Sequence, residues 1–258
     1  MEILGYVGAL FIGLVLGLTG GGGSILTVPI LVYLMSISPV TATAYSLFIV
    51  GTTSTFGAIQ NYRKNLVDIK NGFIFAIPSF IAVYLTRKFI VPRIPEIIIE
   101  SPILITKNTF LMLFFAVIMI FGALSVLKKK SQEINNEEKR NLILIGIQTF
   151  TIGIIIGLVG AGGGFLIIPS LILFAKLPMR KAVGTSLFII AMNSLVGFIG
   201  DVQNLVIEWI FLLTFSAISV VGIFIGMYLT KYTNESQLKK IFAYFVLLMA
   251  AIILLKEM

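Results

Sequence analysis

The chain has 258 residues, of which 58% are hydrophobic and 12% are charged, and its formal net charge is +8. This composition is far too apolar for a soluble domain of this size, so the sequence predicts an integral membrane protein. The absence of cysteine and histidine excludes disulfides, cysteine metal sites and histidine proton shuttles. The basic residues lie in the gaps between apolar segments, which favours membrane topology over a nucleic-acid partner as their explanation.

Long apolar segments follow one another along the chain, and a polar stretch divides them into two groups. In the first half they cover residues 3–18, 25–35, 41–59, 72–85 and 109–127. In the second half they cover residues 142–159, 165–175, 182–199, 206–229 and 241–255. Apolar segments without polar alternation are typical of helices rather than barrel strands, so we expect an all-α, polytopic membrane bundle.

The two halves are repeats of one another. An offset of 140 residues aligns "GLTGGGGSILTVP" at 17–29 with "GLVGAGGGFLIIP" at 157–169, and without a gap it then matches Ser46 to Ser186. Roughly a third of the aligned positions in this region are identical, which indicates an internal duplication. We therefore expect a first membrane repeat at 1–127, a cytoplasmic linker at 128–140 and a second membrane repeat at 141–258.

The segment 25–35 is about 16 Å long as a helix, which is about half of a hydrocarbon core. The preceding glycine run is therefore a kink in one crossing, the tip of a hairpin, or a turn between two full passes. With the linker in the cytoplasm, the positive-inside rule selects the hairpin parity, because Lys176, Arg180, Lys181, Lys231, Lys239 and Lys240 are then inside while Asp201 and Glu208 are outside. The loop that disagrees becomes external and contains Arg87, Lys88, Arg93 and Lys107. An odd number of full crossings in each half predicts two repeats of inverted topology, each with a glycine-broken helical hairpin.

Each glycine run interrupts an apolar helix and leaves backbone groups that need partners. Four glycines in a helix cost about 1 kcal/mol each relative to alanine, and irregular backbone at membrane depth is tolerated only beside protein or water. Because the helix restarts at Ser24 or Gly164, its first amides and its positive dipole end favour an anion. We expect both runs to converge near the bilayer middle. The candidate substrate-binding residues are Gly20, Gly21, Gly22, Gly23, Ser24, Ser46, Thr53, Gly160, Gly162, Gly163, Gly164, Ser186 and Asn193.

These candidates have a purely structural alternative. Glycine runs also allow close helix packing. We expect such packing at the spaced pairs Gly13 with Gly17, Gly153 with Gly157, and Gly222 with Gly226. Buried serine and threonine side chains also bond back to carbonyls of their own helix. The candidate gate or exit residues are Gln60, Asn61 and Arg63 at the end of the third segment, although Arg63 also suits a lipid-phosphate contact.

The acidic residues are informative because all of them lie outside or at the edges of the apolar segments. We therefore expect no buried carboxylate that relays protons or binds a cation. The sequence contains no HExxH or GxSxG motif, so we predict that the protein is not an enzyme, and we expect no metal or cofactor. In the absence of membrane-embedded carboxylates, the ligand that fits best is an anion bound by backbone amides and hydroxyl groups.

The two glycine motifs, followed by "ATAYSLFIV" and "AVGTSLFII", resemble the duplicated signature of the TauE/SafE sulfite exporter family. The resemblance covers nearly the whole chain. It implies a multi-pass permease of the bacterial or archaeal cytoplasmic membrane that moves small sulfur-containing anions, such as sulfite or organosulfonates, often outward. A membrane scaffold or assembly protein and an anion channel are the alternatives.

Overall fold

The structure is a computed structural model that describes residues 2–99, 105–127, 142–230, 232 and 235–257. The predicted linker at 128–140 and Lys231 lie outside the described residues. The elements of the first half are α1 (Glu2–Thr19), α2 (Ser24–Tyr33), α3 (Pro39–Arg63), α4 (Ile69–Leu85), the π-helix η1 (Thr86–Ile90), α5 (Val91–Arg93), β1 (Ile97–Ile99), β2 (Ile105–Thr106) and α6 (Lys107–Leu127). Those of the second half are α7 (Leu142–Val159), α8 (Gly164–Leu173), α9 (Met179–Asp201), α10 (Trp209–Leu229) and α11 (Glu235–Glu257).

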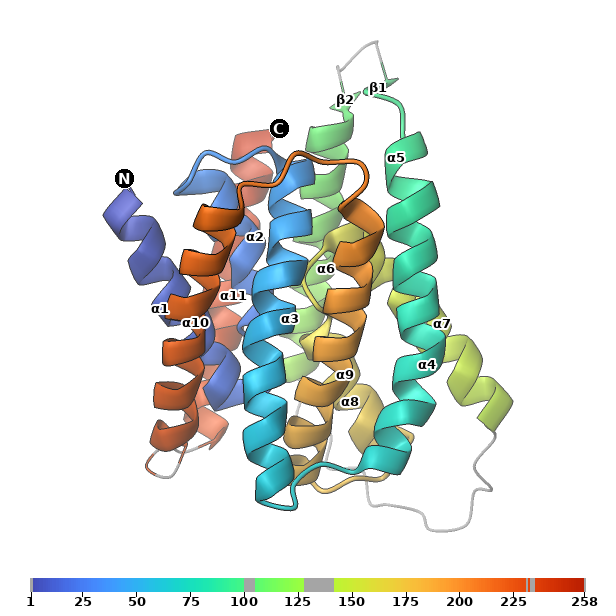
Figure 1. The fold of residues 1–258 in the computed structure, drawn as a ribbon, viewed down its shortest axis with the longest axis vertical. Helices are drawn as coiled ribbons and strands as arrows, with labels where there is room; N and C mark the ends of the chain where they lie inside the picture. The colour runs from blue at the N-terminus through green and yellow to red at the C-terminus, as the bar shows by residue number, and fades with distance from the viewer. Residues whose placement is uncertain (1, 100–104, 128–141, 231, 233–234, 258) are drawn as a thin grey trace.

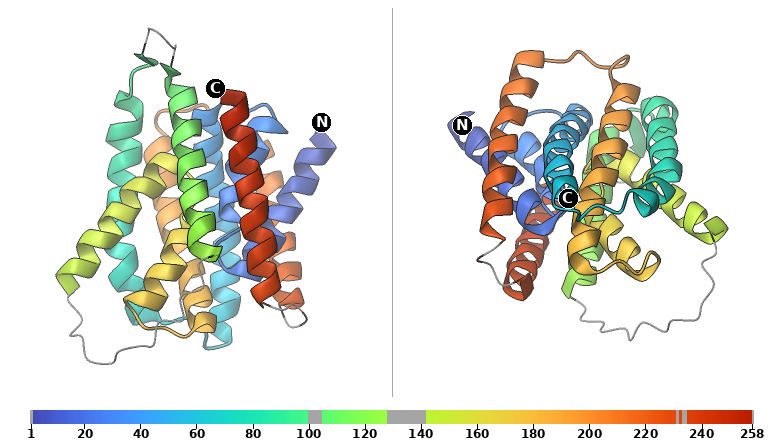
Figure 2. Two further views of the ribbon diagram at one scale, coloured as in Figure 1. Left: turned by 180° about the vertical axis from the view of Figure 1, so that it is seen from behind. Right: turned by 60° about the horizontal axis from the view of Figure 1, so that its bottom comes forward.

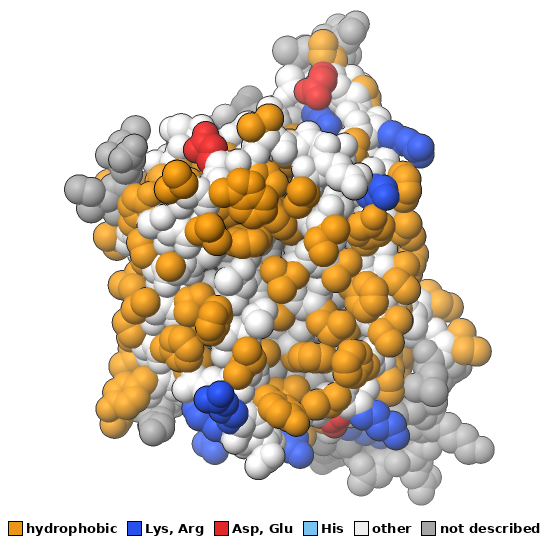
Figure 3. All heavy atoms as spheres, viewed as in Figure 1, with side chains coloured by type: hydrophobic (Ala, Val, Ile, Leu, Met, Phe, Trp, Pro, Cys, Tyr) orange, Lys and Arg blue, Asp and Glu red, His pale blue; other side chains and the backbone are white. Residues whose placement is uncertain are grey.

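The chain forms a bundle whose surface suits a membrane. Within the described ranges, four helices are long and apolar enough to cross a bilayer: Ile69–Arg93, Lys107–Leu124, Met179–Asp201 and Trp209–Leu229. Hydrophobic side chains cover the middle of the molecule, while lysine and arginine side chains lie at its lower end and at its upper right (Figure 3). The predicted class, an all-α membrane protein, agrees with these observations.

Two short connections break the helices where the glycine runs occur. The first break, residues 20–23, joins α1 to α2, and the second break, residues 160–163, joins α7 to α8. Helices α2 and α8 begin at Ser24 and Gly164, as predicted. In Figure 1, α1 and α2 form a hairpin that opens at the upper end of the bundle, whereas α7 and α8 form one that opens at the lower end.

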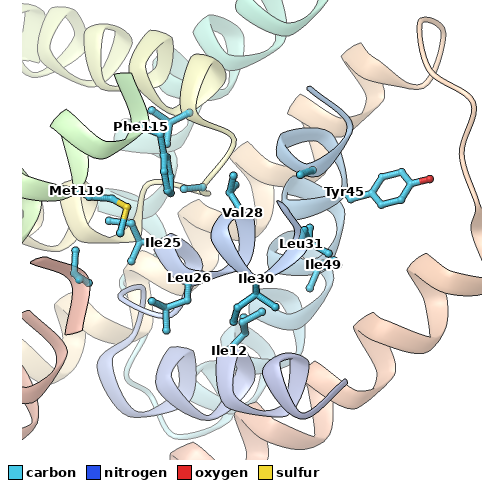
Figure 4. Packing of buried hydrophobic residues seen from close by; sticks show 14 of the residues in the cluster. Ile12, Ile25, Leu26, Val28, Ile30, Leu31, Tyr45, Ile49, Phe115 and Met119 are labelled. Atoms are coloured by element: carbon cyan, nitrogen blue, oxygen red, sulfur yellow. The ribbon is translucent and has the colours of Figure 1, made fainter. Parts of the chain in front are cut away.

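The short helix α2 is enclosed by longer helices. Helices α10, α3, α9 and α4 stand side by side at the front of Figure 1, and α6 packs against α11 on the opposite side (Figure 2). Every α2 residue from Ser24 to Leu31 is buried. Figure 4 shows Ile25 and Leu26 of α2 between Ile12 of α1 and Met119 of α6. A half-length helix that is apolar on all sides needs such an enclosure, because its whole circumference must be covered.

The helix that starts at Ile69 is longer than the predicted segment 72–85. It continues through η1 and α5 to Arg93, past the charged residues that the sequence analysis assigned to a loop. The helix tolerates this charge because Arg87 is fully buried against a carboxylate partner, Asp201. Above this helix, strands β1 and β2 form a short antiparallel pair that the sequence analysis did not predict.

The spaced glycines form packing seams, as predicted. A Cβ atom added to Gly13 of α1 would lie 2.8 Å from the carbonyl carbon of Ser219 in α10, and closer still to its oxygen. Across the same seam, Gly17 faces Gly226. The seam between α7 and α4 is built in the same way, with Gly153 against Ser79. Gly153 and Ser219 are the partners of Gly13 and Ser79 at the repeat offset of 140, so each hairpin packs against a helix from the other half of the sequence.

We expect Gly13→Ala to lower the free energy of unfolding by about 1–3 kcal/mol, because the added methyl group meets the α10 backbone, which has no rotamer to change. The measurement is the thermal midpoint of the purified protein in detergent. The matched control is Gly146→Ala in α7, where an added Cβ would meet no atom of the described residues within 4 Å beyond the backbone of its own helix. Equal midpoints for the two variants would contradict the seam.

Polar contacts at the two ends of the bundle also obey the repeat offset. The amide of Asp68 donates to the Thr185 hydroxyl at 2.9 Å, and the amide of Glu208 donates to the Tyr45 hydroxyl at 2.8 Å. Residues 68 and 208, like residues 45 and 185, differ by 140. The same contact therefore anchors the loop after α3 on α9 and the loop after α9 on α3.

Candidate functional site

The two breaks meet inside the bundle, where Gly21 of the first break contacts Gly164, the residue directly after the second break. A Cβ atom on Gly21 would lie 2.6 Å from the Cα atom of Gly164, and one on Gly164 would meet Gly21 in the same way. All residues of both breaks are buried. The absence of side chains at these two glycines therefore lets the backbones of the two hairpins pass in direct contact.

Each break also contacts the beginning of a long helix. A Cβ on Gly20 would meet the side chain of Val183 in α9, and one on Gly160 would lie 2.5 Å from the Cβ atom of Thr43 in α3. Val183 and Thr43 are equivalent at the repeat offset, so the contact occurs twice. The breaks differ in conformation, because φ is positive at Gly160, Gly162 and Gly163 in the second break but only at Gly20 in the first. The two breaks are therefore similar in position but differ in backbone conformation.

Several backbone amides of the breaks already have acceptors. Gly20 donates to the Leu16 carbonyl and Gly160 donates to the Ile156 carbonyl, both at 2.8 Å. Gly22 donates to the Thr19 hydroxyl at 2.9 Å, and Gly163 donates to the Ala161 carbonyl at 2.7 Å. These amides are engaged, so an anion at the breaks depends on the remaining amides and on the surrounding side chains.

Hydroxyl groups from α3 and α9 surround the breaks. Ser186 donates to the Gly20 carbonyl at 2.6 Å, while the hydroxyl of Ser46, its equivalent at the repeat offset, is buried without a hydrogen-bond partner in the described structure. Ser54 and Ser194 have equally unpartnered hydroxyls. A Cβ on Gly162 would lie 3.0 Å from the Ser194 oxygen, which places this hydroxyl against the second break. Buried polar atoms without partners are costly, and a polar ligand that reached these hydroxyls would satisfy them.

The other predicted residues bond to different partners: the first break, a neighbouring helix or a carbonyl of their own helix. Ser24 donates to the Gly21 carbonyl at 2.7 Å. Asn193 accepts a hydrogen bond from Ser79 at 2.9 Å, and its amide nitrogen is buried without a partner among the described residues. Thr53 bonds back to the Ile49 carbonyl at 2.6 Å, which is the structural alternative for hydroxyl groups in helices.

The predicted gate residues lie at the lower end of α3. The Asn61 amide donates to the Gly57 carbonyl at 2.9 Å and approaches the Met227 sulfur at 3.6 Å. The Gln60 carbonyl oxygen is buried and has no partner in the part of the chain described. Arg63 is exposed. Asn61 is therefore built into the interface between α3 and α10, whereas Arg63 is free to face the surroundings.

The expectation of no buried carboxylate is wrong, because Asp201 is 4% exposed. Its carboxylate lies 3.4 Å from Nη1 of Arg87, whose side chain is fully buried instead of lying in an external loop. Nη1 also donates to the Thr43 hydroxyl at 3.1 Å, and a Cβ on Gly160 would meet Nη2. The repeat offset of 140 also aligns Arg87 with Met227 and Asp201 with Asn61, and Asn61 and Met227 contact each other as well. This extension of the repeat was the signal in the sequence that could have linked Arg87 to Asp201.

The interface between α3 and α9 differs at its two ends. At one end, an apolar cavity of about 390 Å³ is lined by residues that include Ala58 and Ile69. At the other end, the equivalent residues are Phe198 and Trp209, whose rings pack against Phe48 at 5.0 and 6.1 Å between centroids. Aromatic rings therefore fill one end of this interface, whereas the cavity lies at the end that is equivalent to it by the repeat.

Comparison with known proteins gives a consistent set of relatives. The family model described as Sulfite exporter TauE/SafE matches residues 6–253. A probable membrane transporter protein of Xylella fastidiosa strain 9a5c is 25% identical over 246 residues, which cover 93% of this chain and 89% of the relative. The probable membrane transporter protein YunE of Bacillus subtilis is 28% identical over 233 residues, or 79% of each chain. No solved structure matches the chain.

Proposed function

Because the chain belongs to the TauE/SafE sulfite exporter family and is a membrane transporter, we propose that it exports a small sulfur-containing anion, such as sulfite or an organosulfonate, across the cytoplasmic membrane. The observation that carries the site is the buried contact between the two breaks, at Gly21 and Gly164. The Ser194 hydroxyl, which has no hydrogen-bond partner among the described residues, lies against the second break at Gly162. Irregular backbone at membrane depth that is buried in protein and lined by polar groups is typical of transporter binding sites.

The proposed topology is a pair of inverted repeats. The lower end in Figure 1 is the cytoplasmic end, because the loops near Arg63 and Arg180 lie there. The first hairpin then enters from outside and the second from the cytoplasm. The repeat-related contacts of Gly13 with Ser219 and of Gly153 with Ser79 support this arrangement.

The exchange of hairpins between the halves suits transport by a rocking motion. Helix α1 packs on α10 and α7 packs on α4, so each break is held by helices of both halves. Movement of one half against the other changes the environment of both breaks together. The interface between α3 and α9 has a cavity at one end and packed aromatic rings at the other. This difference supports a transporter that is closed at one end while the other end is less tightly packed.

The direct test combines thermal stability in detergent with anion flux in proteoliposomes. The probes are sulfite, thiosulfate, sulfate and taurine. An anion that binds the folded protein stabilises it by about 2.7 kcal/mol when its concentration is about a hundred times its Kd. We also expect saturable flux of the same anion. Flux without saturation would favour a channel. The absence of both stabilisation and flux with all four probes would contradict the proposal and favour a scaffold.

A further inference from the structure

We propose that Arg87 binds the charge of the transported anion through the edge of its guanidinium group that carries Nε and Nη2. Asp201 and Thr43 are positioning residues that hold the other end of the group. The inference rests on the proposed function and names the residue that recognises its substrate. It also places the charge-binding part of the site beside the second break only.

The hydrogen bonds of Arg87 leave one edge of the group free. Nη1 lies 3.4 Å from the Asp201 carboxylate and donates to Thr43 at 3.1 Å. Nε and Nη2 are buried and have no hydrogen-bond partner in the structure described here. A guanidinium group has five N–H donors in a planar fork, and the Nε/Nη2 edge matches two oxygens of a sulfite, sulfonate or sulfate group. The unpartnered edge therefore has the geometry of a bidentate oxyanion site.

The free edge faces the second break. A Cβ added to Gly160 would come into contact with Nη2 of Arg87, so the missing side chain leaves the Nη2 atom next to the backbone of the break. The break itself continues to Gly162, which faces the unpartnered Ser194 hydroxyl. Arg87 and the Ser194 hydroxyl thus both lie against the second break.

The repeat shows that the fold does not need these charges. The repeat offset relates Asp201 to Asn61 and Arg87 to Met227. The Asn61 amide lies 3.6 Å from the Met227 sulfur. Repeat-equivalent helices are therefore joined by a neutral contact between α3 and α10 and by an ion pair between α9 and η1. A buried ion pair is weak evidence for stability, because its desolvation offsets much of its attraction. The charges are better explained by recognition of an anion.

The test uses the full-length protein and the paired variant Arg87→Met with Asp201→Asn, which installs the neutral contact of the other end. The apparent affinities for sulfite, thiosulfate, sulfate and taurine are measured by thermal shift and from the KM of flux. We expect the paired variant to fold and its affinity for the transported anion to fall at least about tenfold. Asp201→Asn alone keeps the charge of Arg87 but removes the carboxylate that positions its guanidinium group, and we expect a loss of affinity smaller than that of the paired variant.

Matched variants separate recognition from general electrostatics. Lys107→Met removes another buried cation, which is paired with Glu96 at 3.9 Å beside the strand pair, and we expect unchanged affinity. If the paired variant fails to fold, Arg87→Lys keeps the charge but loses the fork, and we expect a similar loss of affinity. Wild-type affinity in the paired variant or in Arg87→Lys would overturn the role of Arg87. Absence of any anion response in the wild-type protein would instead contradict the proposed function.

Discussion

Gly164→Ala is expected to reduce anion flux at least about tenfold, because the added methyl group meets the backbone at Gly21, where the two breaks touch. Neither partner has a side chain that can rotate away, so the breaks must separate. The repeat equivalent of Gly164 is Ser24, whose side chain is buried and bonds to Gly21, so the intolerance belongs to the crossing point and not to every helix start. The measurement is flux of the transported anion in proteoliposomes.

Gly146→Ala is the control for this effect, because it adds the same methyl group to α7 at a place where, in the described part of the chain, only the backbone of its own helix lies within 4 Å. We expect its flux and its thermal midpoint to equal those of the wild type. A folded Gly164→Ala protein with wild-type flux would show that the contact between the breaks has no part in transport. In that case the glycines would serve packing alone, which is the structural alternative for these runs.

Removal of one partner of the buried ion pair is expected to have the largest effect on stability. Arg87→Met leaves the Asp201 carboxylate buried without its cation, and we expect a loss of about 3–5 kcal/mol in the free energy of unfolding. Asp201→Asn leaves Arg87 buried without its carboxylate and is expected to cost a similar amount. The measurement is reversible unfolding of the purified protein in detergent micelles.

The paired variant, Arg87→Met with Asp201→Asn, completes a double-mutant cycle with these single changes. We expect it to be more stable than either single variant, because no unpaired charge stays buried and Asn61 with Met227 forms the same contact in the other half. Additive losses in the cycle would contradict a direct interaction between Arg87 and Asp201. Affinity for the anion is a separate quantity, so the stability of the pair can be measured without any ligand.

Much of the fold follows from apolar segments and glycine runs. The starts of α2 and α8 were predicted at Ser24 and Gly164, because a glycine run ends one helix and the following apolar residues begin another. The extent of the helix to Arg93 was missed, since local rules end a membrane segment at the first charges. Arg87 is compatible with the helix interior only through a partner 114 positions away in the chain. A window along the sequence does not contain that partner.

The candidate site was predicted only in part, again because a local stretch of sequence does not show which distant residues come into contact. Backbone conformation is encoded locally, so the glycine runs could be recognised, and the structure brings them into contact at Gly21 and Gly164. The hydrogen bond from Ser186 to the Gly20 carbonyl joins residues 166 positions apart, and local sequence patterns do not contain that information. The role of each break in anion binding stays a prediction.

The aromatic cluster at one end of the interface between α3 and α9 has a spectroscopic consequence. Trp209 is the single tryptophan of the chain, and its ring lies 6.1 Å from those of Phe48 in α3 and Phe198 in α9. All indole fluorescence of the native protein therefore originates at this one place, where the first residue of α10 meets both helices. The unmodified protein thus carries its own optical probe of whether the filled end of the interface stays closed, and no label has to be introduced near the breaks.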